Sequence, residues 1–173
     1  SHLALPEVSD DYSTLKDNDY YPVIKLNHYH WAMTAHVLDK AIDPDKPATV
    51  SKKVIQEIRD VINFKGLLIS DCITMRALNG TMADRAYGAF EAGCDVVIYS
   101  AAKLQDMEDI MIVAPNVTVL QEQIIKDSYA TAAEKRSELN VYLIKARLLE
   151  IIEEYSDKTD LLFNNFDPTE QLH

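Results

Sequence analysis

A short apolar run that ends in an acid constrains this chain more than any other segment. Gly66-Leu67-Leu68-Ile69 leads directly into Ser70 and Asp71, and Met75 follows shortly after. Such a run between polar residues is typical of a strand buried on both faces in a parallel sheet. A carboxylate just past the carboxyl end of such a strand lies where α/β proteins place their chemistry. Asp71 is therefore the first candidate catalytic residue, although an Asp here can also be the N-cap of a following helix.

The charge and the apolar pattern exclude several classes of partner. The 173 residues include 17 basic and 28 acidic side chains, which gives a net charge of −11. This excess of negative charge argues against nucleic acid or an anionic membrane surface as a partner. No apolar run approaches the roughly 18 residues of a membrane-spanning helix, and no signal peptide begins the chain. We expect a cytoplasmic protein in which Cys72 and Cys94 are free thiols.

Strand and helix patterns alternate through the middle of the chain. Strands are expected over residues 31–37, 66–70 and 95–100. A helix is expected after the N-cap residue Ser51, and a second over residues 82–92 with Gly93 ending it. Shorter or later helices are expected over residues 20–29, 103–114, 119–136 and 137–155, and loops over residues 1–20 and 39–48.

Two of the later helices carry apolar stripes. The expected inward-facing residues are Leu120, Ile124, Ile125 and Tyr129 on the first, and Leu139, Leu143, Ala146, Leu149 and Ile152 on the second.

The order strand, helix, strand, helix, strand predicts a parallel sheet with right-handed crossovers. Three strands leave both sheet edges unprotected, and a complete (β/α)₈ barrel takes roughly 250 residues. We therefore expect the C-terminal portion of a TIM-type barrel over residues 1–155, followed by a polar tail over residues 156–173. The remaining strands would come from residues upstream of Ser1, which is not a translation start, or from another chain.

Several short motifs occur in a characteristic order. They are Met33-Thr34-Ala35-His36-Val37, Pro47-Ala48-Thr49-Val50-Ser51, Gly66-Leu67-Leu68-Ile69-Ser70-Asp71 with Met75, Arg85-Ala86 and Ala92-Gly93-Cys94-Asp95. In this order and spacing the chain closely resembles family 3 glycoside hydrolases of the bacterial β-N-acetylhexosaminidase type, over about residues 1–115.

The resemblance implies roles for residues at both ends of this region. In the family an Asp after a strand-Ser pattern is the nucleophile, which corresponds to Asp71. A His on a mobile catalytic loop is the general acid/base, which corresponds to His2 within the expected loop 1–20. Its partner Asp and a substrate-binding Lys-His stretch would lie upstream. The family pattern has a second Asp where this chain has Cys72.

The activity implied is retaining hydrolysis that releases terminal, non-reducing β-linked N-acetylglucosamine, on muropeptide fragments in peptidoglycan recycling. A retaining glycosidase needs an ionised nucleophile and a proton donor near the leaving group. A histidine has a pKa suited to donating and recovering that proton near neutral pH. No metal or organic cofactor is implied, and the expected partners are the carbohydrate and the N-terminal half of the barrel. The alternative is a truncated or degenerate barrel that only binds.

For other residues near the expected strands the pattern leaves more than one role open. His36 either contacts substrate or is a packed, hydrogen-bonded histidine, and Met75 either lies beside the sugar or in the core. Arg85 is expected to be a structural ion-pair partner of a carboxylate. His28 and His30 form a His-x-His pair, but no third ligand follows at a fixed spacing, so a metal site is not expected.

Overall fold

The computed structural model describes residues 4–138 and 142–151 of the chain. It divides into two compact units, residues 1–128 and 129–173, each of which is described by itself. The predicted end of the domain at residue 155 and the tail 156–173 lie outside the described residues. Within the described residues no helix has the length and apolar character required to cross a membrane.

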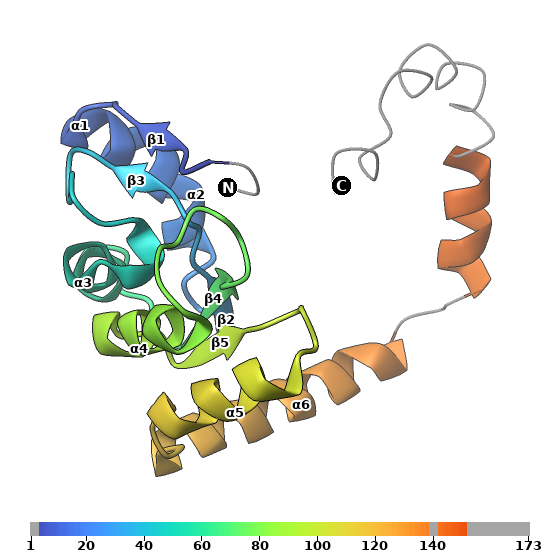
Figure 1. The fold of residues 1–173 in the computed structure, drawn as a ribbon. Coiled ribbons are helices and arrows are strands. Elements are labelled where there is room, and N and C mark those ends of the chain that lie inside the picture. The colour runs from blue at the N-terminus through green and yellow to red at the C-terminus, as the bar shows by residue number, and fades with distance from the viewer. Residues whose placement is uncertain (1–3, 139–141, 152–173) are drawn as a thin grey trace. The chain divides into compact units, whose positions relative to one another are not determined.

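The first unit is an α/β structure, as the sequence predicts (Figure 1). Its strands are β1 (Glu7–Val8), β2 (Trp31–Met33), β3 (Leu38–Asp39), β4 (Leu67–Cys72) and β5 (Val96–Ile98). Its helices are α1 (Tyr12–Thr14), the π-helical turn η1 (Leu15–Asp19), α2 (Tyr20–Lys25), the 3₁₀ turn η2 (Ala48–Val50), α3 (Lys52–Asp60), α4 (Met82–Ala92), α5 (Leu104–Val113) and α6 (Val119–Glu138), the last of which continues into the second unit.

The sheet that carries the predicted site has the strand order β2-β4-β5, and all its pairs are parallel. Trp31 pairs with Leu67 and Met33 with Ile69, so β2 and β4 run in register. A second, two-stranded parallel sheet joins β1 to β3. The predicted parallel βαβαβ arrangement is therefore confirmed, and β4 is the central strand.

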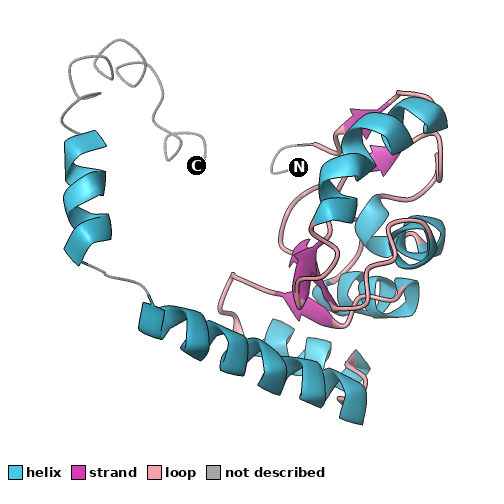
Figure 2. Cartoon of the chain, turned by 180° about the vertical axis from the view of Figure 1, so that it is seen from behind, coloured by secondary structure: helices cyan, strands magenta, loops and turns pink. Residues whose placement is uncertain are grey.

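Helices α3 and α4 lie together on one side of the three-stranded sheet (Figures 1 and 2). Their apolar faces meet the sheet in a core cluster of buried residues: Ile55, Ile62, Phe64, Leu68, Ala89, Ala92 and Cys94. The Ser51 hydroxyl accepts a hydrogen bond from the Val54 amide at 3.2 Å, which confirms Ser51 as the N-cap of α3. Gly93 ends α4 with φ at +115°, a left-handed conformation that glycine adopts without strain.

Three predicted boundaries were wrong. The loop expected over residues 1–20 contains β1, α1 and η1, because Asp11 caps α1 by accepting from the Thr14 amide at 2.9 Å and Leu15 is buried. The strand expected over residues 31–37 ends at Met33, since the chain then turns to bring Thr34 and His36 against Thr49. Leu38 and Asp39 form a strand because they pair with β1.

The inward-facing residues predicted on the last two helices were also partly wrong. Residues 142–151 are helical, but Leu143 is 69% exposed and Leu149 is 55% exposed. Ala146 is exposed too, whereas Leu139 and Ile152 lie outside the described residues. On α6, Ile124 and Ile125 are half-buried while Leu120 and Tyr129 are exposed. Helical spacing shows which residues share a face, but it does not say what covers that face.

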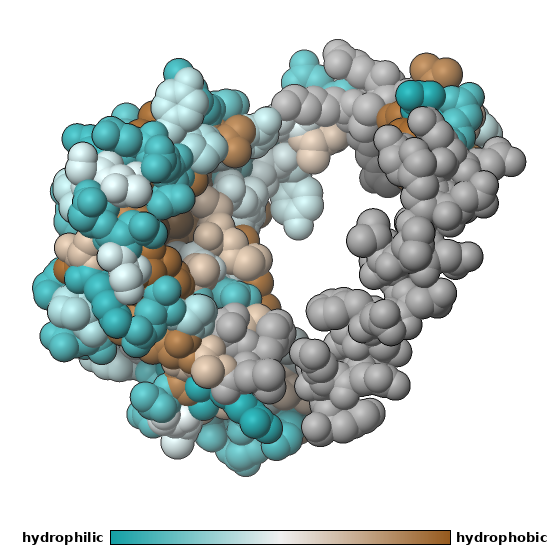
Figure 3. Space-filling model, turned by 90° about the horizontal axis from the view of Figure 1, so that it is seen from above, coloured by the Kyte–Doolittle hydropathy of each residue, from teal (hydrophilic) through white to brown (hydrophobic). Residues whose placement is uncertain are grey.

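The surface of the first unit is uneven in polarity. Figure 3 shows mostly hydrophilic side chains over its visible surface, with hydrophobic side chains gathered on one side. On strand β2, Trp31 is 36% exposed and Met33 is 58% exposed. Apolar side chains on a strand at the edge of a sheet are the usual mark of a surface that another segment covers.

Asp95 fastens the amino-terminal ends of β4 and β5 to two helices. Its Oδ2 accepts hydrogen bonds from the Leu68 amide at 2.8 Å and from Arg59 Nη2 at 2.9 Å. Its Oδ1 accepts one from Gln121 Nε2 at 2.7 Å. Arg59 also donates to the carbonyls of Phe64 and Gly66, at 3.1 and 2.7 Å. A single carboxylate therefore links β4 to both α3 and α6.

Replacement of Asp95 by Asn should destabilise the fold. The amide keeps the size of the side chain but loses the charge, and it offers one acceptor atom where the carboxylate offers two. We expect the free energy of unfolding to fall by about 2 kcal/mol, measured by chemical denaturation. The control is Lys52→Ala, which removes an exposed ion pair with Glu91 and should change stability by less than about 0.5 kcal/mol. Equal effects of the two substitutions would contradict this role of Asp95.

Candidate active site

The carboxyl end of β4 is irregular at the residue predicted to be catalytic. Ile69 pairs with Val96 and Cys72 pairs with Ile98. Between these two pairs β4 advances by three residues and β5 by two, so β4 contains one extra residue. The Ser70 hydroxyl lies in this irregularity, fully buried, and accepts a hydrogen bond from the Ile98 amide at 3.0 Å. The side chain thus replaces the backbone partner that the register shift removes. Such β-bulges re-aim the side chain beside them and often adjoin active sites.

Asp71 lies on the bulge and is half-buried. Its Oδ1 accepts a hydrogen bond from the Cys72 amide at 2.7 Å. In the part of the chain that the structure describes, its Oδ2 has no hydrogen bond or ion pair. Asp71 is not a helix N-cap, because α4 is capped by Thr81, whose hydroxyl accepts from the Asp84 amide. One carboxylate oxygen is therefore fixed and the other is available to a reacting partner.

A cluster of polar side chains surrounds the next residue, Cys72. Its Sγ lies 2.9 Å from Ser100 Oγ and 3.1 Å from Thr74 Oγ1, at the carboxyl ends of β4 and β5. Burial raises the pKa of the Cys72 thiol, but the hydrogen bonds from Ser100 and Thr74 outweigh it and hold that pKa below the usual value. The Cys72 thiol is thus more acidic than that of an ordinary cysteine.

His36 lies beneath this strand end and is 1% exposed. Its Nδ1 is 2.8 Å from Thr49 Oγ1, and its Nε2 is 3.0 Å from the carbonyl oxygen of Cys72. Both ring nitrogens therefore have protein partners. Of the two roles left open for His36, this geometry favours the packed, hydrogen-bonded histidine.

Arg85 organises the loop between β4 and α4. Its Nη1 donates to the carbonyls of Ile73 and Met75 at 2.7 and 3.1 Å, and its Nε donates to Gly80 at 3.1 Å. The structural role predicted for Arg85 is confirmed, but the predicted ion pair with a carboxylate was wrong, since its partners here are backbone carbonyls. Met75 is half-buried in this loop, four residues after Asp71, and its carbonyl is the one that accepts from Arg85.

The remaining candidate residues of the sequence are His2 and the pair His28 and His30. His2 lies outside the described residues. His28 and His30 line a separate depression with Lys65 and Gly66. Within residues 4–138 and 142–151, no group of three His, Cys, Asp or Glu side chains is arranged to hold a metal ion. The absence of a metal requirement stays a prediction.

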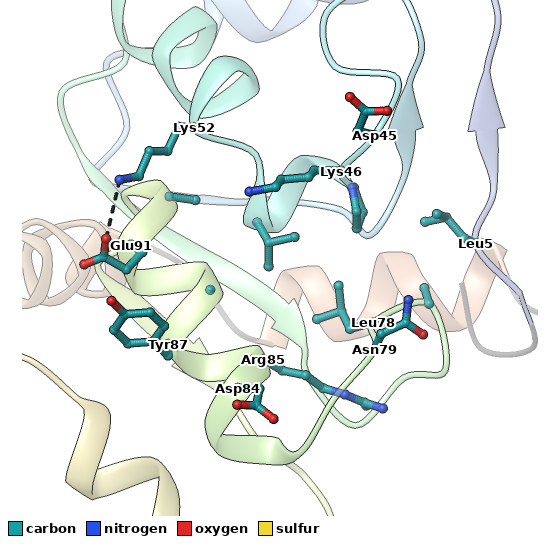
Figure 4. A pocket seen from close by; sticks show the side chains of 15 residues that line it. Leu5, Asp45, Lys46, Lys52, Leu78, Asn79, Asp84, Arg85, Tyr87 and Glu91 are labelled. Carbon is teal, nitrogen blue, oxygen red and sulfur yellow. Dashed lines mark hydrogen bonds and ion pairs between the residues drawn. The ribbon is translucent and has the colours of Figure 1, made fainter.

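A groove on the surface lies between the η2–α3 segment and α4 (Figure 4). Charged residues of both signs line it, among them Lys46, Lys52, Arg85 and Glu91, with Lys52 and Glu91 paired at 3.4 Å. Asp71 is not among its lining residues. Because the candidate carboxylate Asp71 does not line the groove, we place the candidate active site at the strand ends instead.

Comparison with known proteins identifies the family of this chain. The sequence profile of the glycosyl hydrolase family 3 N-terminal domain matches residues 1–132. The chain belongs to glycosyl hydrolase family 3. The predicted resemblance is thereby confirmed.

The matched segments make up only part of each of the following relatives and similar structures. A β-hexosaminidase of Neisseria meningitidis serogroup C is 39% identical over 103 residues, which cover 57% of this chain and 28% of the relative. One from Idiomarina loihiensis is 34% identical over 102 residues, covering 57% and 31%. The crystal structure of native NagZ from Neisseria gonorrhoeae superposes with a TM-score of 0.60 at 32% identity, over 73% of this chain and 37% of that one.

A family 3 β-N-acetylglucosaminidase from Paenibacillus gives a TM-score of 0.61 at 29% identity, over 75% of this chain and 26% of that one. The chain thus spans about a third of the length of the curated relatives it matches.

Sequence reasoning missed three residues that shape the site. Ser100 was not singled out, and Thr49 and Ser70 were noted only as parts of motifs. Each is a small hydroxyl residue at or beside a strand or helix end, where a side-chain oxygen often replaces a backbone partner. That rule marks such residues as candidates, but it does not reveal that Ser70 bonds to Ile98 or Thr49 to His36, since these pairs are distant in sequence.

The two cysteines should differ sharply in reactivity. The lowered pKa of Cys72 gives it more thiolate at neutral pH than an ordinary cysteine, whereas burial raises the pKa of Cys94 to about 11. Alkylation by iodoacetamide, followed by mass spectrometry of tryptic peptides, should label Cys72 first. When the labelling rate is measured against pH, its midpoint for Cys72 should lie at a lower pH than that of a model thiol. Ser100→Ala should move this midpoint upward, and Ser128→Ala on α6 should not. Faster labelling of Cys94 would contradict the assignment.

Proposed function

We propose that this chain carries the nucleophile of a retaining glycoside hydrolase that releases terminal, non-reducing β-linked N-acetylglucosamine. The observation that carries the proposal is Asp71, which stands on the bulged end of a central parallel strand with one oxygen fixed and the other unengaged. An ionised carboxylate so placed can attack an anomeric carbon and form a glycosyl-enzyme intermediate, which water then hydrolyses. Names of relatives such as β-hexosaminidase and β-N-acetylglucosaminidase support the sugar specificity.

The second catalytic group in this proposal is His2. The family resemblance gives it the role of general acid/base, protonating the leaving oxygen and later activating water. Met75 would lie beside the bound sugar, and His36 would act from beneath the site. Fragments of peptidoglycan in the cytoplasm are the proposed natural substrate, and neither metal nor organic cofactor takes part.

We further propose that the sheet is the C-terminal portion of a TIM-type barrel that an N-terminal half completes. Three parallel strands with helices on one side, and exposed apolar residues on edge strand β2, support this arrangement. The three strands would then be covered on their inner face by the strands of that N-terminal half, which would also contribute the upstream groups of the active site.

An alternative function is a binding module without catalysis. Cys72, in the position where the family pattern has an acid, favours this alternative, because a thiol cannot replace a carboxylate as a hydrogen-bond acceptor of equal strength. Such a module would bind N-acetylglucosamine-containing glycans with no turnover.

Turnover of a chromogenic β-N-acetylglucosaminide by the whole gene product tests the proposal. Asp71→Asn should lower kcat by a factor of about 1,000 or more, because the amide cannot form the glycosyl-enzyme intermediate. The matched control Asp60→Asn changes an exposed acid on α3 and should leave kcat unchanged.

The same assay separates the alternatives. Residues 1–173 on their own should show no turnover if the barrel needs its N-terminal half. Glycan binding by the whole gene product without turnover, unchanged in Asp71→Asn, would instead support the binding module.

A further inference from the structure

Three buried side chains form a continuous chain of hydrogen bonds that ends beside Asp71. Thr34 Oγ1 is 2.9 Å from Thr49 Oγ1, which is 2.8 Å from His36 Nδ1. His36 Nε2 is in turn 3.0 Å from the carbonyl oxygen of Cys72. All three side chains are at most 5% exposed. The bonds therefore link the end of β2 through η2 to the end of β4 without access to bulk water.

The chemistry of the last acceptor sets the direction of every bond in this chain. A carbonyl oxygen can only accept, so His36 Nε2 must carry the hydrogen. In the neutral ring Nδ1 is then an acceptor, and the Thr49 hydroxyl must donate to it. Thr49 Oγ1 in turn accepts from the Thr34 hydroxyl. The arrangement selects a single tautomer of His36, which is the Nε2–H form.

The peptide groups of Cys72 are held on both sides as a result. Its amide donates to Asp71 Oδ1 at 2.7 Å. Its carbonyl accepts from His36 and also from the Met75 amide, at 3.1 Å, which closes the turn after β4. The amide and the carbonyl belong to successive peptide groups, so these contacts together restrain both backbone torsions of Cys72. Hence the imidazole that binds the carbonyl also limits where the Asp71 carboxylate can point.

We propose that His36, oriented by Thr49 and Thr34, is a positioning residue that holds the Cys72 backbone and thereby aims the Asp71 carboxylate at the substrate. The catalytic part of this inference rests on the proposed function of Asp71. His36 touches neither the carboxylate nor the open side of the site, since both of its nitrogens are used within the protein. Its expected effect is on the chemical step, not on sugar binding.

The hydrogen-bond chain is tested by NMR on the whole gene product labelled with ¹⁵N-histidine, without any need for activity. At mildly alkaline pH the His36 ring, assigned by the loss of its signals in His36→Gln, should show the Nε2–H tautomer with a hydrogen-bonded Nδ1. Thr49→Val removes the donor while keeping the shape, and it should shift the Nδ1 resonance toward that of an unbonded nitrogen. Thr49→Ser keeps the hydroxyl and should not. An Nδ1–H tautomer, or equal spectra for the two variants, would overturn the proposal.

The effect on the backbone is tested by amide hydrogen exchange in two His36 variants. In His36→Gln the side-chain amide can still donate to the Cys72 carbonyl, whereas His36→Phe fills the space without a donor. We expect faster exchange at the Cys72 and Met75 amides in the Phe variant than in the Gln variant. The Asp95 amide, bonded to the Leu68 carbonyl at 2.8 Å, is the reference that reports general destabilisation. Equal acceleration at all three amides would count against a local role of His36. The NMR comparison of Thr49→Val with Thr49→Ser then decides whether the hydrogen-bond chain exists.

Kinetics test the catalytic consequence. His36→Phe should lower kcat about ten-fold or more with KM changed by less than about two-fold, because a displaced carboxylate loses alignment in the chemical step. His36→Gln should restore a large part of kcat. A rise in KM at constant kcat would mean that His36 binds substrate, contrary to the proposal. If the wild-type protein shows no turnover, the proposed function fails, while the NMR results still decide whether His36 holds the Cys72 backbone.

Discussion

The hydrogen bond between the Ile98 amide and the Ser70 hydroxyl is the contact on which the candidate site depends. Strand β4 gains a residue relative to β5 at this point, and without a side-chain acceptor the part-buried Ile98 amide would lose its partner. Ser70 stabilises the bulge by supplying this acceptor, and the bulge shifts the direction of the chain at Asp71. A regular strand would continue its alternation of faces, so the position of the carboxylate is a consequence of this irregularity.

Both ends of β4 are held by polar side chains from other elements. At the amino-terminal end, Asp95 joins the Leu68 amide to Arg59 and Gln121. At the carboxyl end, His36 binds the Cys72 carbonyl, while Arg85 binds the carbonyls of the following loop. The apolar contacts of Leu68 with α3 and α4 fill the space between. A strand fixed at both ends in this way is a rigid support for a reactive group, which preorganised catalysis requires.

The sequence was sufficient for the parallel βαβαβ order, the start of α3 at Ser51 and the end of α4 at Gly93, because each rests on local signals. Apolar periodicity reports helices and buried strands, and Ser and Gly mark helix ends through their own hydrogen bonding and conformational freedom. Asp71 could be located for the same reason, as an acid at the end of a buried apolar run, although β4 extends past the predicted end at residue 70 to Cys72. The boundaries of β2 and β3 could not, since they depend on pairing with residues distant in sequence.

The tertiary contacts of polar residues could not be predicted from the sequence either. Arg85 was expected to pair with a carboxylate, but backbone carbonyls lie within its reach instead. His36 had two possible roles until its neighbours Thr49 and Cys72 were known. The apolar stripe on residues 142–151 likewise predicted a helix, but it did not predict which surface the stripe packs against, and Leu143 and Leu149 are exposed in the described structure. In each case the residue type restricts the kinds of contact, and only the fold selects among them.

The most direct test of Asp71 as nucleophile is covalent trapping. A fluorinated N-acetylglucosaminyl donor, which forms the glycosyl-enzyme faster than water hydrolyses it, is incubated with the whole gene product before tryptic digestion and mass spectrometry. The tryptic peptide spanning residues 66–76 contains Asp71 as its only carboxylic side chain. We predict a glycosyl adduct on that peptide, with fragmentation placing it on Asp71 and not on Cys72. An adduct on any other residue, or turnover of the substrate with no adduct trapped, would contradict the assignment.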